Sequence, residues 1–244
     1  MKIALILTGF MRKNKKTLNS LKQQILDKYD TDIYISSWDT IEKRYNPHAD
    51  KNKPTNTQLC KITQEKIINQ YKEYNLKKYV FHNYDDYYKN RFENIEFLDR
   101  PDDIFKKNKR AKRLGSFWVE RLRDQWTIVK NGFDLIDNKQ DYDIFLKIRS
   151  DIFLYNIKIH NTDKLILSPP EFPDFEISDY FAYGNLHNMN CYCTMIDHIK
   201  KIYTKHNINI AVSEELLYFY LKEYCNIDIF VDNTIIYKRL QNNR

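Results

Sequence analysis

Arg149 and Asp151 are the residues whose types and spacing most directly suggest chemistry. They lie in the stretch 141–154, whose apolar residues are too continuous for a half-exposed strand and too few for a helix. This pattern predicts a central strand covered on both faces. Residues two apart on a strand project to the same side, and open α/β sheets bind ligands at the carboxyl ends of their strands. An acid and a base there could bind a metal-bound diphosphate, or they could form a structural ion pair.

A second group of candidates follows the first predicted strand, residues 2–8. Gly9 lets backbone approach a ligand closely, and Arg12 would face that ligand at the start of a helix with apolar residues at helical spacing. The first strand-to-helix turn of an α/β sheet commonly meets a nucleotide. We therefore predict nucleotide contacts at Thr8, Gly9 and Arg12; the alternative is a plain tight turn with a solvated arginine.

Three further residues are candidates for contacts with the nucleotide. Trp38 lies at the end of the predicted strand 30–39, where its ring could stack on a base or sugar, or could close the core. The predicted helix 116–136 carries an apolar stripe; Gln125 falls close to the edge of that stripe and Arg121 further outside it. A partly buried Gln125 needs a hydrogen-bond partner, which is either a ligand or a backbone carbonyl.

Acidic residues in the last third of the chain suggest a role on a second substrate. Asp179 interrupts an aromatic predicted strand, 177–184, and aspartate suits strand structure poorly, so it lies at an edge or is held there for a purpose. Further on, Ser213 is predicted to be a helix N-cap, with Glu214 and Glu215 in the first turn. Acids are favoured at that position by the helix dipole alone, which is the structural alternative for both glutamates.

Composition limits the classes of partner. The chain has 244 residues, a formal net charge of +7 and a pI of about 9.0, which favours an anionic partner such as a nucleotide, a phosphate, a nucleic acid or an acidic membrane surface. Six basic residues lie in the segment 106–113, which is interpreted as a solvated loop; the alternatives are a clamp on a diphosphate, a contact with an anionic acceptor, or a nucleic-acid contact. No apolar run reaches the length of a signal peptide core or a membrane span. We expect a cytoplasmic protein, at the membrane surface or, for a virus-encoded chain, in the host cytoplasm.

The order of five segments resembles the GT-A type of glycosyltransferase, and more narrowly the WavE lipopolysaccharide-synthesis family and related capsule or viral sugar transferases. The segments are KIALILTGFMR, DIYISSWD, YDIFLKIRSDI, SDYFAYGN and SEELL. The resemblance implies a GT-A-like (Rossmann-like) α/β fold with a mostly parallel central sheet flanked by helices. It implies one domain over 1–244, with a nucleotide-sugar half, 1–155, and a smaller acceptor-side half, 156–244.

The resemblance also implies roles for individual residues. Asp151 takes the place of a metal ligand, for Mn²⁺ or Mg²⁺ on the donor diphosphate, while Arg149 stands where the common motif has an acid. Physical reasoning agrees that a departing diphosphate needs a hard cation with carboxylate ligands, or fixed basic side chains. An inverting enzyme also needs a carboxylate base. Glu215 matches the position of that base, and Asp179 is the rival base or, with Glu214, an acceptor-binding residue.

The sequence therefore predicts a metal-assisted, inverting glycosyltransferase that moves a sugar from a nucleotide-diphosphate donor to a glycan or lipid-linked acceptor. Retaining chemistry stays open, because spacing in sequence does not set stereochemistry. One alternative is a nucleic-acid-binding protein that uses residues 106–113, although no stable nucleic-acid partner is expected. The other is a nucleotidyltransferase on a similar sheet, for which the chain lacks a phosphate-cradling glycine-rich loop.

Overall fold

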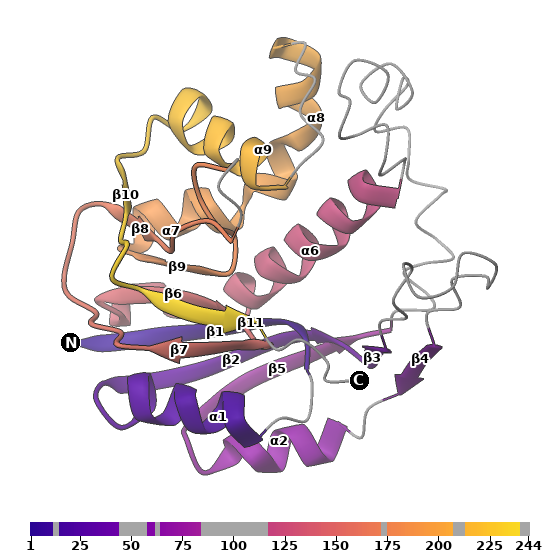
Figure 1. The fold of residues 1–244 in the computed structure, drawn as a ribbon, viewed down its shortest axis with the longest axis vertical. Helices are drawn as coiled ribbons and strands as arrows, with labels where there is room; N and C mark the ends of the chain where they lie inside the picture. The colour runs from indigo at the N-terminus through magenta and orange to yellow at the C-terminus, as the bar shows by residue number, and fades with distance from the viewer. Residues whose placement is uncertain are drawn as a thin grey trace.

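A seven-stranded sheet runs through the middle of the protein in a computed structural model that describes residues 1–11, 15–43, 58–61, 64–83, 117–171, 175–206 and 213–239. The strand order is β10-β8-β9-β6-β1-β2-β5 (Figure 1). Their bounds are β1 Lys2–Phe10, β2 Asp30–Trp38, β5 Leu76–His82, β6 Ile144–Arg149, β8 Leu165–Leu167, β9 Phe181–Gly184 and β10 Ile229–Val231. All neighbours are parallel except β9, which is antiparallel to β6 and β8.

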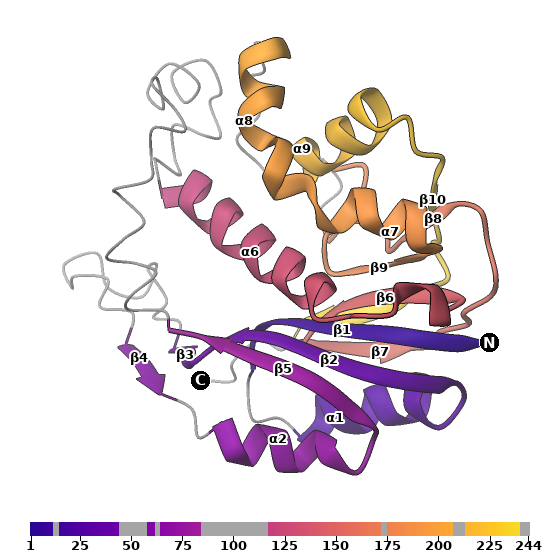
Figure 2. The same ribbon diagram turned by 180° about the vertical axis from the view of Figure 1, so that it is seen from behind.

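Helices cover both faces of this sheet, as Figures 1 and 2 show from opposite sides. One face carries α1 Lys15–Leu21, which continues as a π-helical turn, Lys22–Leu26, and α2 Gln64–Lys72. The other carries α6 Phe117–Asp134, α7 Leu186–Cys193, α8 Met195–His206 and α9 Ser213–Phe219, the last continuing as a π-helical turn, Tyr220–Tyr224. A 3-10 turn, Lys139–Asp141, precedes β6. The predicted α/β class, a mostly parallel central sheet flanked by helices, is confirmed.

Two antiparallel pairs lie outside the main sheet. β3 Thr40–Lys43 pairs with β4 Gln58–Lys61, and β7 Ile152–Tyr155 pairs with β11 Ile236–Arg239. Among the described helices, none has the length and apolar character needed to cross a bilayer.

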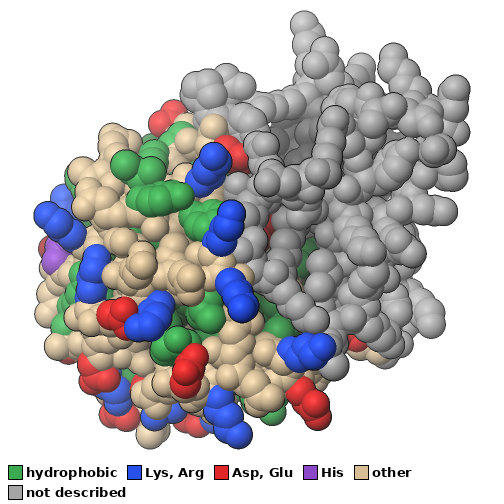
Figure 3. Space-filling view, turned by 60° about the horizontal axis from the view of Figure 1, so that its bottom comes forward, with side chains coloured by type: hydrophobic (Ala, Val, Ile, Leu, Met, Phe, Trp, Pro, Cys, Tyr) green, Lys and Arg blue, Asp and Glu red, His purple; other side chains and the backbone are tan. Residues whose placement is uncertain are grey.

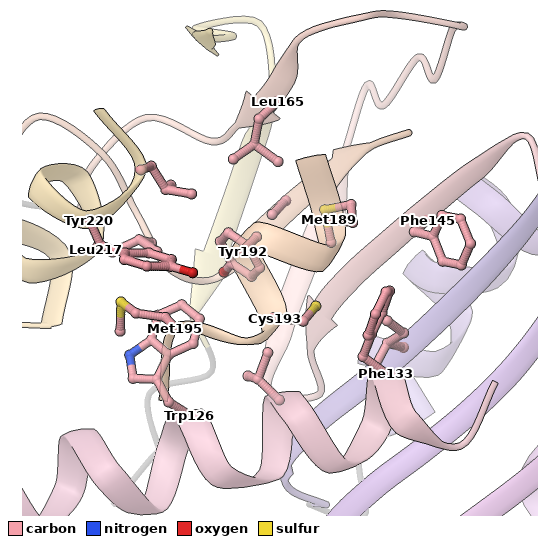
Figure 4. Packing of buried hydrophobic residues seen from close by; sticks show 14 of the residues in the cluster. Trp126, Phe133, Phe145, Leu165, Met189, Tyr192, Cys193, Met195, Leu217 and Tyr220 are labelled. Carbon is pink, nitrogen blue, oxygen red and sulfur yellow. The ribbon is translucent and has the colours of Figure 1, made fainter. Parts of the chain in front are cut away.

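The core has two parts because successive strand residues point to opposite faces. From β1, Ile3, Leu5 and Leu7 join the cluster under α1 and α2, whereas Ala4 and Ile6 join the cluster under α6 to α9. Figure 4 shows side chains of α6, α7 and the segment around α9 meeting in the second cluster. The continuous apolar composition of β1 therefore follows from burial on both sides.

Gly132 sets how closely α6 approaches the sheet. A Cβ atom at this position would lie 2.6 Å from the Cγ2 of Ile6 and 3.2 Å from the Cβ of Ser36. Since real Cβ atoms do not tolerate a 2.6 Å contact, a residue without a side chain is required where the helix crosses β1 and β2.

The predicted central strand in the stretch 141–154 is β6, and it ends at its charged residues. β6 stops at Arg149, and after a turn β7 joins a different sheet. The turn is fixed to β1, because the Ser150 amide donates to the Thr8 carbonyl (2.9 Å) and its hydroxyl to the Phe10 carbonyl (3.0 Å). The prediction of a buried central strand that ends at these charged residues is confirmed.

The sequence also predicts strands over residues 227–236 and 177–184, and the structure differs from both predictions. Residues 227–236 form β10 and the approach to β11, separated by a turn in which the Thr234 amide and hydroxyl both donate to Asp232 (2.9 and 2.6 Å). Residues 177–184 become a strand only at Phe181, so Asp179 precedes β9 and does not interrupt it.

Candidate active site at the carboxyl ends of β1 and β6

Thr8 and Arg149 are partners in the parallel register of β1 and β6, so two segments 141 positions apart end side by side. Gly9 follows with φ +100°, a conformation that favours glycine. A Cβ there would lie 3.3 Å from the Cγ of Arg149 and 3.7 Å from the Oγ of Ser150. Gly9 therefore allows the stem of Arg149 to pass close over the backbone, in addition to any approach of a ligand.

Arg149 is held in a bidentate ion pair with Asp151. Its Nε donates to Asp151 Oδ1 (2.6 Å) and its Nη2 to Oδ2 (2.8 Å), the geometry that makes arginine–carboxylate pairs strong. The guanidinium carbon lies 4.1 Å from the centre of the Tyr180 ring. Burial alone would lower the pKa of Arg149. The charge and hydrogen bonds of Asp151 outweigh this effect, so the net pKa lies above its usual value. The Arg149 side chain is 16% exposed and that of Asp151 7%.

Asp179 is buried, and both its carboxylate and its backbone carbonyl accept hydrogen bonds. Its Oδ2 accepts from the Gln125 amide and from the Ser213 hydroxyl (3.2 Å). Its backbone carbonyl accepts from the Lys147 ammonium and the Tyr192 hydroxyl (3.2 Å). Its other oxygen, Oδ1, is buried without a hydrogen-bond partner in the described part of the chain. A carboxylate held this firmly, with one oxygen lacking a partner among the described residues, is suited to accept a hydrogen bond from a ligand.

Gln125 and Ser213 connect this carboxylate to two helices. The expectation that Gln125 is partly buried and hydrogen-bonded is confirmed, but its partner is a side-chain carboxylate and not the backbone carbonyl or ligand that the sequence suggested. Ser213 accepts from the indole Nε1 of Trp126 (3.0 Å) while donating to Asp179. Helical periodicity gave the face on which Gln125 lies; it contains no information on a partner 54 residues away.

Lys147 is the residue that the sequence analysis missed. It is fully buried in β6, on the face of Phe145 and opposite to that of Leu146 and Ile148. Burial lowers its pKa to about 8, an effect that the charge of Asp179 opposes and that of Arg149 reinforces. The signal was available, because a lysine in the middle of a strand covered on both faces must have a buried acceptor.

The two glutamates of α9 have different surroundings. Glu214 is partly buried, and burial, followed by the negative charge of Asp179, raises its pKa to about 8, while Arg149 opposes the shift. Glu214 therefore belongs to one electrostatic cluster with Asp179 and Arg149. Glu215 is also partly buried, in the same helical turn.

Of the remaining predicted nucleotide contacts, only the side chain of Trp38 is among the described residues. Trp38 is 2% exposed and its ring meets the His82 ring edge-on at 5.8 Å, so the structure places it in the core, which is one of its two predicted roles. Arg12 and the basic segment 106–113 lie outside the described residues. Arg121 lies on α6 one turn before Gln125, and its side chain is outside the described part. In the view of Figure 3, acidic and basic side chains are interspersed over the described surface.

The described residues around Asp151 do not offer a divalent metal the set of oxygen ligands that it needs. Mg²⁺ and Mn²⁺ need several oxygen ligands, whereas both oxygens of Asp151 already accept from Arg149. Within the described ranges, no group of three or more His, Cys, Asp or Glu side chains could hold a metal ion. The carboxylate of Asp151 is therefore better suited to its ion pair with Arg149 than to binding a metal ion.

Comparison with known proteins adds little to this geometry. No protein-family model matches the chain, and no curated protein sequence does. Among solved structures, the chain is similar to mouse Xyloside xylosyltransferase 1 in its apo form, with 9% identity and a TM-score of 0.44 over 95% of this chain and 85% of that one. It is also similar to a glycosyltransferase involved in the glycosylation of the major capsid of PBCV-1, with 10% identity and a TM-score of 0.39 over 94% of this chain and 81% of that one. Identities and scores this low do not assign an activity.

Proposed function

We propose that this protein is a glycosyltransferase that moves a sugar from a nucleotide-diphosphate donor to a hydroxyl of a glycan or lipid-linked acceptor. One observation carries the proposal: at the carboxyl end of β6, hydrogen-bonded neighbouring segments carry a fixed guanidinium, Arg149, and an oriented carboxylate, Asp179, whose charge acts on that guanidinium. The backbone joins the two, because the Arg149 amide donates to the carbonyl of Tyr180, the residue after Asp179 (2.9 Å). The resemblance of five ordered segments to GT-A enzymes supports the same class.

In the proposed sugar transfer, Arg149, Asp179 and Glu214 each have one role. As the acceptor oxygen forms its bond to the anomeric carbon, the bond from that carbon to the diphosphate oxygen breaks, and the nucleoside diphosphate leaves with the electron pair. Arg149 would stabilise the developing negative charge. Oδ1 of Asp179 would accept the proton of the acceptor hydroxyl, since it is the carboxylate oxygen left without a partner in the described residues. Glu214 would contact the acceptor beside it.

Two assignments compete for the base. The sequence resemblance points to Glu215, whereas the geometry favours Asp179, whose orientation is fixed by Gln125 and Ser213. We propose Asp179 as the base and keep Glu215 as the alternative. Direct attack of the acceptor oxygen on the anomeric carbon is a single displacement, which inverts the configuration at that carbon.

The test is consumption of nucleotide sugars by the purified protein. A panel of uridine, guanosine, cytidine and thymidine diphosphate sugars is incubated with the wild type, and release of the nucleoside diphosphate is measured. We expect Asp179→Asn to lower turnover of the active donor by about 10²- to 10⁴-fold, and Glu215→Gln to have a smaller effect. The control is Asp163→Asn, which makes the same change at an exposed position.

Three results would count against the proposal. It fails if no sugar nucleotide is consumed. It also fails if the released product is sugar 1-phosphate, because a nucleotidyltransferase transfers the nucleoside monophosphate and leaves the sugar phosphate behind. Full activity of a folded Asp179→Asn protein would remove Asp179 as the base.

A further inference from the structure

Within the proposed function, we infer that the donor diphosphate is bound directly by the Arg149 guanidinium, without a divalent ion, and that Asp151 is a positioning residue that orients Arg149. The position after the central strand, where the resemblance implied a metal ligand, is already occupied by a charge pair. Asp151 offers neither oxygen to a metal while Arg149 holds both. The inference rests on the proposed function, because it names how that site holds its donor.

Arg149 has the hydrogen-bonding capacity for this role. A guanidinium carries five N–H groups in a fixed plane, and Asp151 uses one on Nε and one on Nη2. Among the described residues, Nη1 has no hydrogen-bond partner, which leaves its two N–H groups and the second N–H of Nη2 for a ligand; one N–H of Nη1 runs parallel to that of Nη2. Such a fork matches two phosphate oxygens. The side chain is 16% exposed, which leaves an edge open to an anion.

The guanidinium is also fixed before any ligand arrives. Its stem lies against Gly9, where a Cβ would come within 3.3 Å, and its face lies 4.1 Å from the Tyr180 ring centre. The Tyr180 hydroxyl is itself bonded to Glu171 (2.6 Å), and its ring meets Tyr237 edge-on at 5.4 Å. Preorganised donors stabilise developing charge without a cost of reorganisation during the reaction.

A second buried cation lies beside the pair. Lys147 is fully buried in the same strand, two residues before Arg149 and on the same face. Asp151 and Asp179 both act on its charge. Arg149 and Lys147 thus place two cations on one face of β6, where the metal would otherwise be the main source of positive charge.

The test is binding of nucleoside diphosphates measured by calorimetry, with excess EDTA and, separately, with Mn²⁺ or Mg²⁺. The probes are the diphosphates of uridine, guanosine, cytidine and thymidine. We expect at least one to bind wild-type protein with a Kd that differs by less than about twofold between EDTA and metal. This comparison needs no variant, so it stands even where a substitution prevents folding.

Two substitutions at the pair then separate the roles. Arg149→Lys should weaken binding about tenfold or more, since a lysine keeps the charge but loses the planar fork. Asp151→Asn should weaken binding less and leave it as insensitive to metal as in the wild type. The control is Lys72→Gln, which removes an exposed cation from α2 on the opposite face of the sheet and should change nothing.

The possible failures are distinguishable. Binding that requires Mn²⁺ or Mg²⁺, or a metal-induced gain that Asp151→Asn abolishes, overturns the inference and leaves the glycosyltransferase proposal standing. Unchanged affinity in folded Arg149→Lys also overturns it. If none of the diphosphates binds under any condition, the inference and the proposed function both fail.

Discussion

Asp179 accepts hydrogen bonds at Oδ2 and at its backbone carbonyl, while its Oδ1 has no partner among the described residues. A buried acceptor without a partner costs about 1–3 kcal/mol, and folds usually remove such a cost by placing a donor nearby. Here donors converge on Oδ2 and on the backbone carbonyl while Oδ1 stays without one in the described residues. The pattern is typical of a group whose missing partner is a ligand.

The first prediction concerns the side chains that orient Asp179. Gln125→Met removes one donor at similar volume, so the carboxylate gains freedom and its remaining oxygen is less well placed. We expect turnover to fall about 10- to 100-fold, the usual effect of losing a supporting hydrogen bond, with little change in donor KM. Steady-state kinetics measure both constants. A matched substitution on the same helix, Thr127→Ala, should have no such effect, and equal losses in the two variants would contradict the idea.

The second prediction concerns pH. The raised pKa of Glu214, about 8 against 4.5 for the ordinary group, follows from burial and then from Asp179, with Glu171 adding to it and Arg149 opposing it. Between these two pH values the folded protein holds a proton that the unfolded chain has released. The free energy of unfolding therefore falls as pH rises from about 4.5 to about 8.

Glu214→Gln tests this sign directly. The variant should be the more stable protein above pH 8, by an amount that shrinks to nothing as pH falls to 4.5. Chemical unfolding of both proteins across this range measures the difference. A constant difference at every pH would show that Glu214 titrates normally.

At the scale of elements, the site depends on how α6 lies on the sheet, because this helix carries Gln125 to Asp179. Gly132 determines that contact: it lies beside Ile6 of β1 and Ser36 of β2. Two turns separate it from Gln125, so a helix lifted at one point would move the amide away from its carboxylate. Packing of the helix and geometry of the site are linked in this way.

The third prediction tests that contact. In an exposed helix, replacing glycine by alanine stabilises by about 1 kcal/mol. Here Gly132→Ala should destabilise by about 1–3 kcal/mol, because the new methyl group is too close to Ile6. Denaturant unfolding measures the change. Combining it with Ile6→Ala should cost less than the sum of the two single changes; strict additivity would show that the residues do not interact.

The sequence was informative wherever a single segment decides the answer. The unbroken runs of apolar residues identified β1 and β6. Because parallel strands end at the same edge of a sheet, the sequence also placed Gly9 near Arg149, in agreement with the register of the two strands. It failed where the answer depends on a partner elsewhere in the chain. The burial of Trp38 against His82, the hydrogen bond from Gln125 to Asp179 and the buried position of Lys147 are of this kind.

The course of the chain after a strand end was not decided by the sequence either. A polar pair such as Ser150 and Asp151 looks like the end of a strand whether the chain stops, turns or continues. Only the hydrogen bonds of Ser150 to β1 decide between these possibilities. The pairing of Arg149 with Asp151 across that turn also requires coordinates, since spacing alone allowed either a metal ligand or an ion pair.

At the scale of the whole molecule, the sheet interleaves the two halves of the chain. β9, from the later half, pairs with β6 from the earlier half, and β11 pairs with β7. Residues 1–155 therefore end with two strands, β6 and β7, that each have a partner beyond residue 155. Division at that point leaves unpaired strand edges in both fragments.

The fourth prediction follows from this interleaving. Fragment 1–155 alone should lack a cooperative unfolding transition and should associate in solution, whereas the full chain should unfold cooperatively. Circular dichroism with thermal melting and size-exclusion chromatography with light scattering test both statements. A monomeric, cooperatively folded fragment would show that the first half is an independent unit.

The hydrogen bond from the Arg149 amide to the Tyr180 carbonyl has a consequence for the product. This main-chain hydrogen bond connects the part of the site that would hold the donor with the part that would receive the acceptor. Because it joins two backbone groups, a side-chain substitution does not remove it. We therefore expect substitutions at Arg149 and Asp179 to slow the reaction without changing its regiochemistry. Two-dimensional NMR of the isolated product, which reports the hydroxyl that has been glycosylated, would give the same linkage from each active variant.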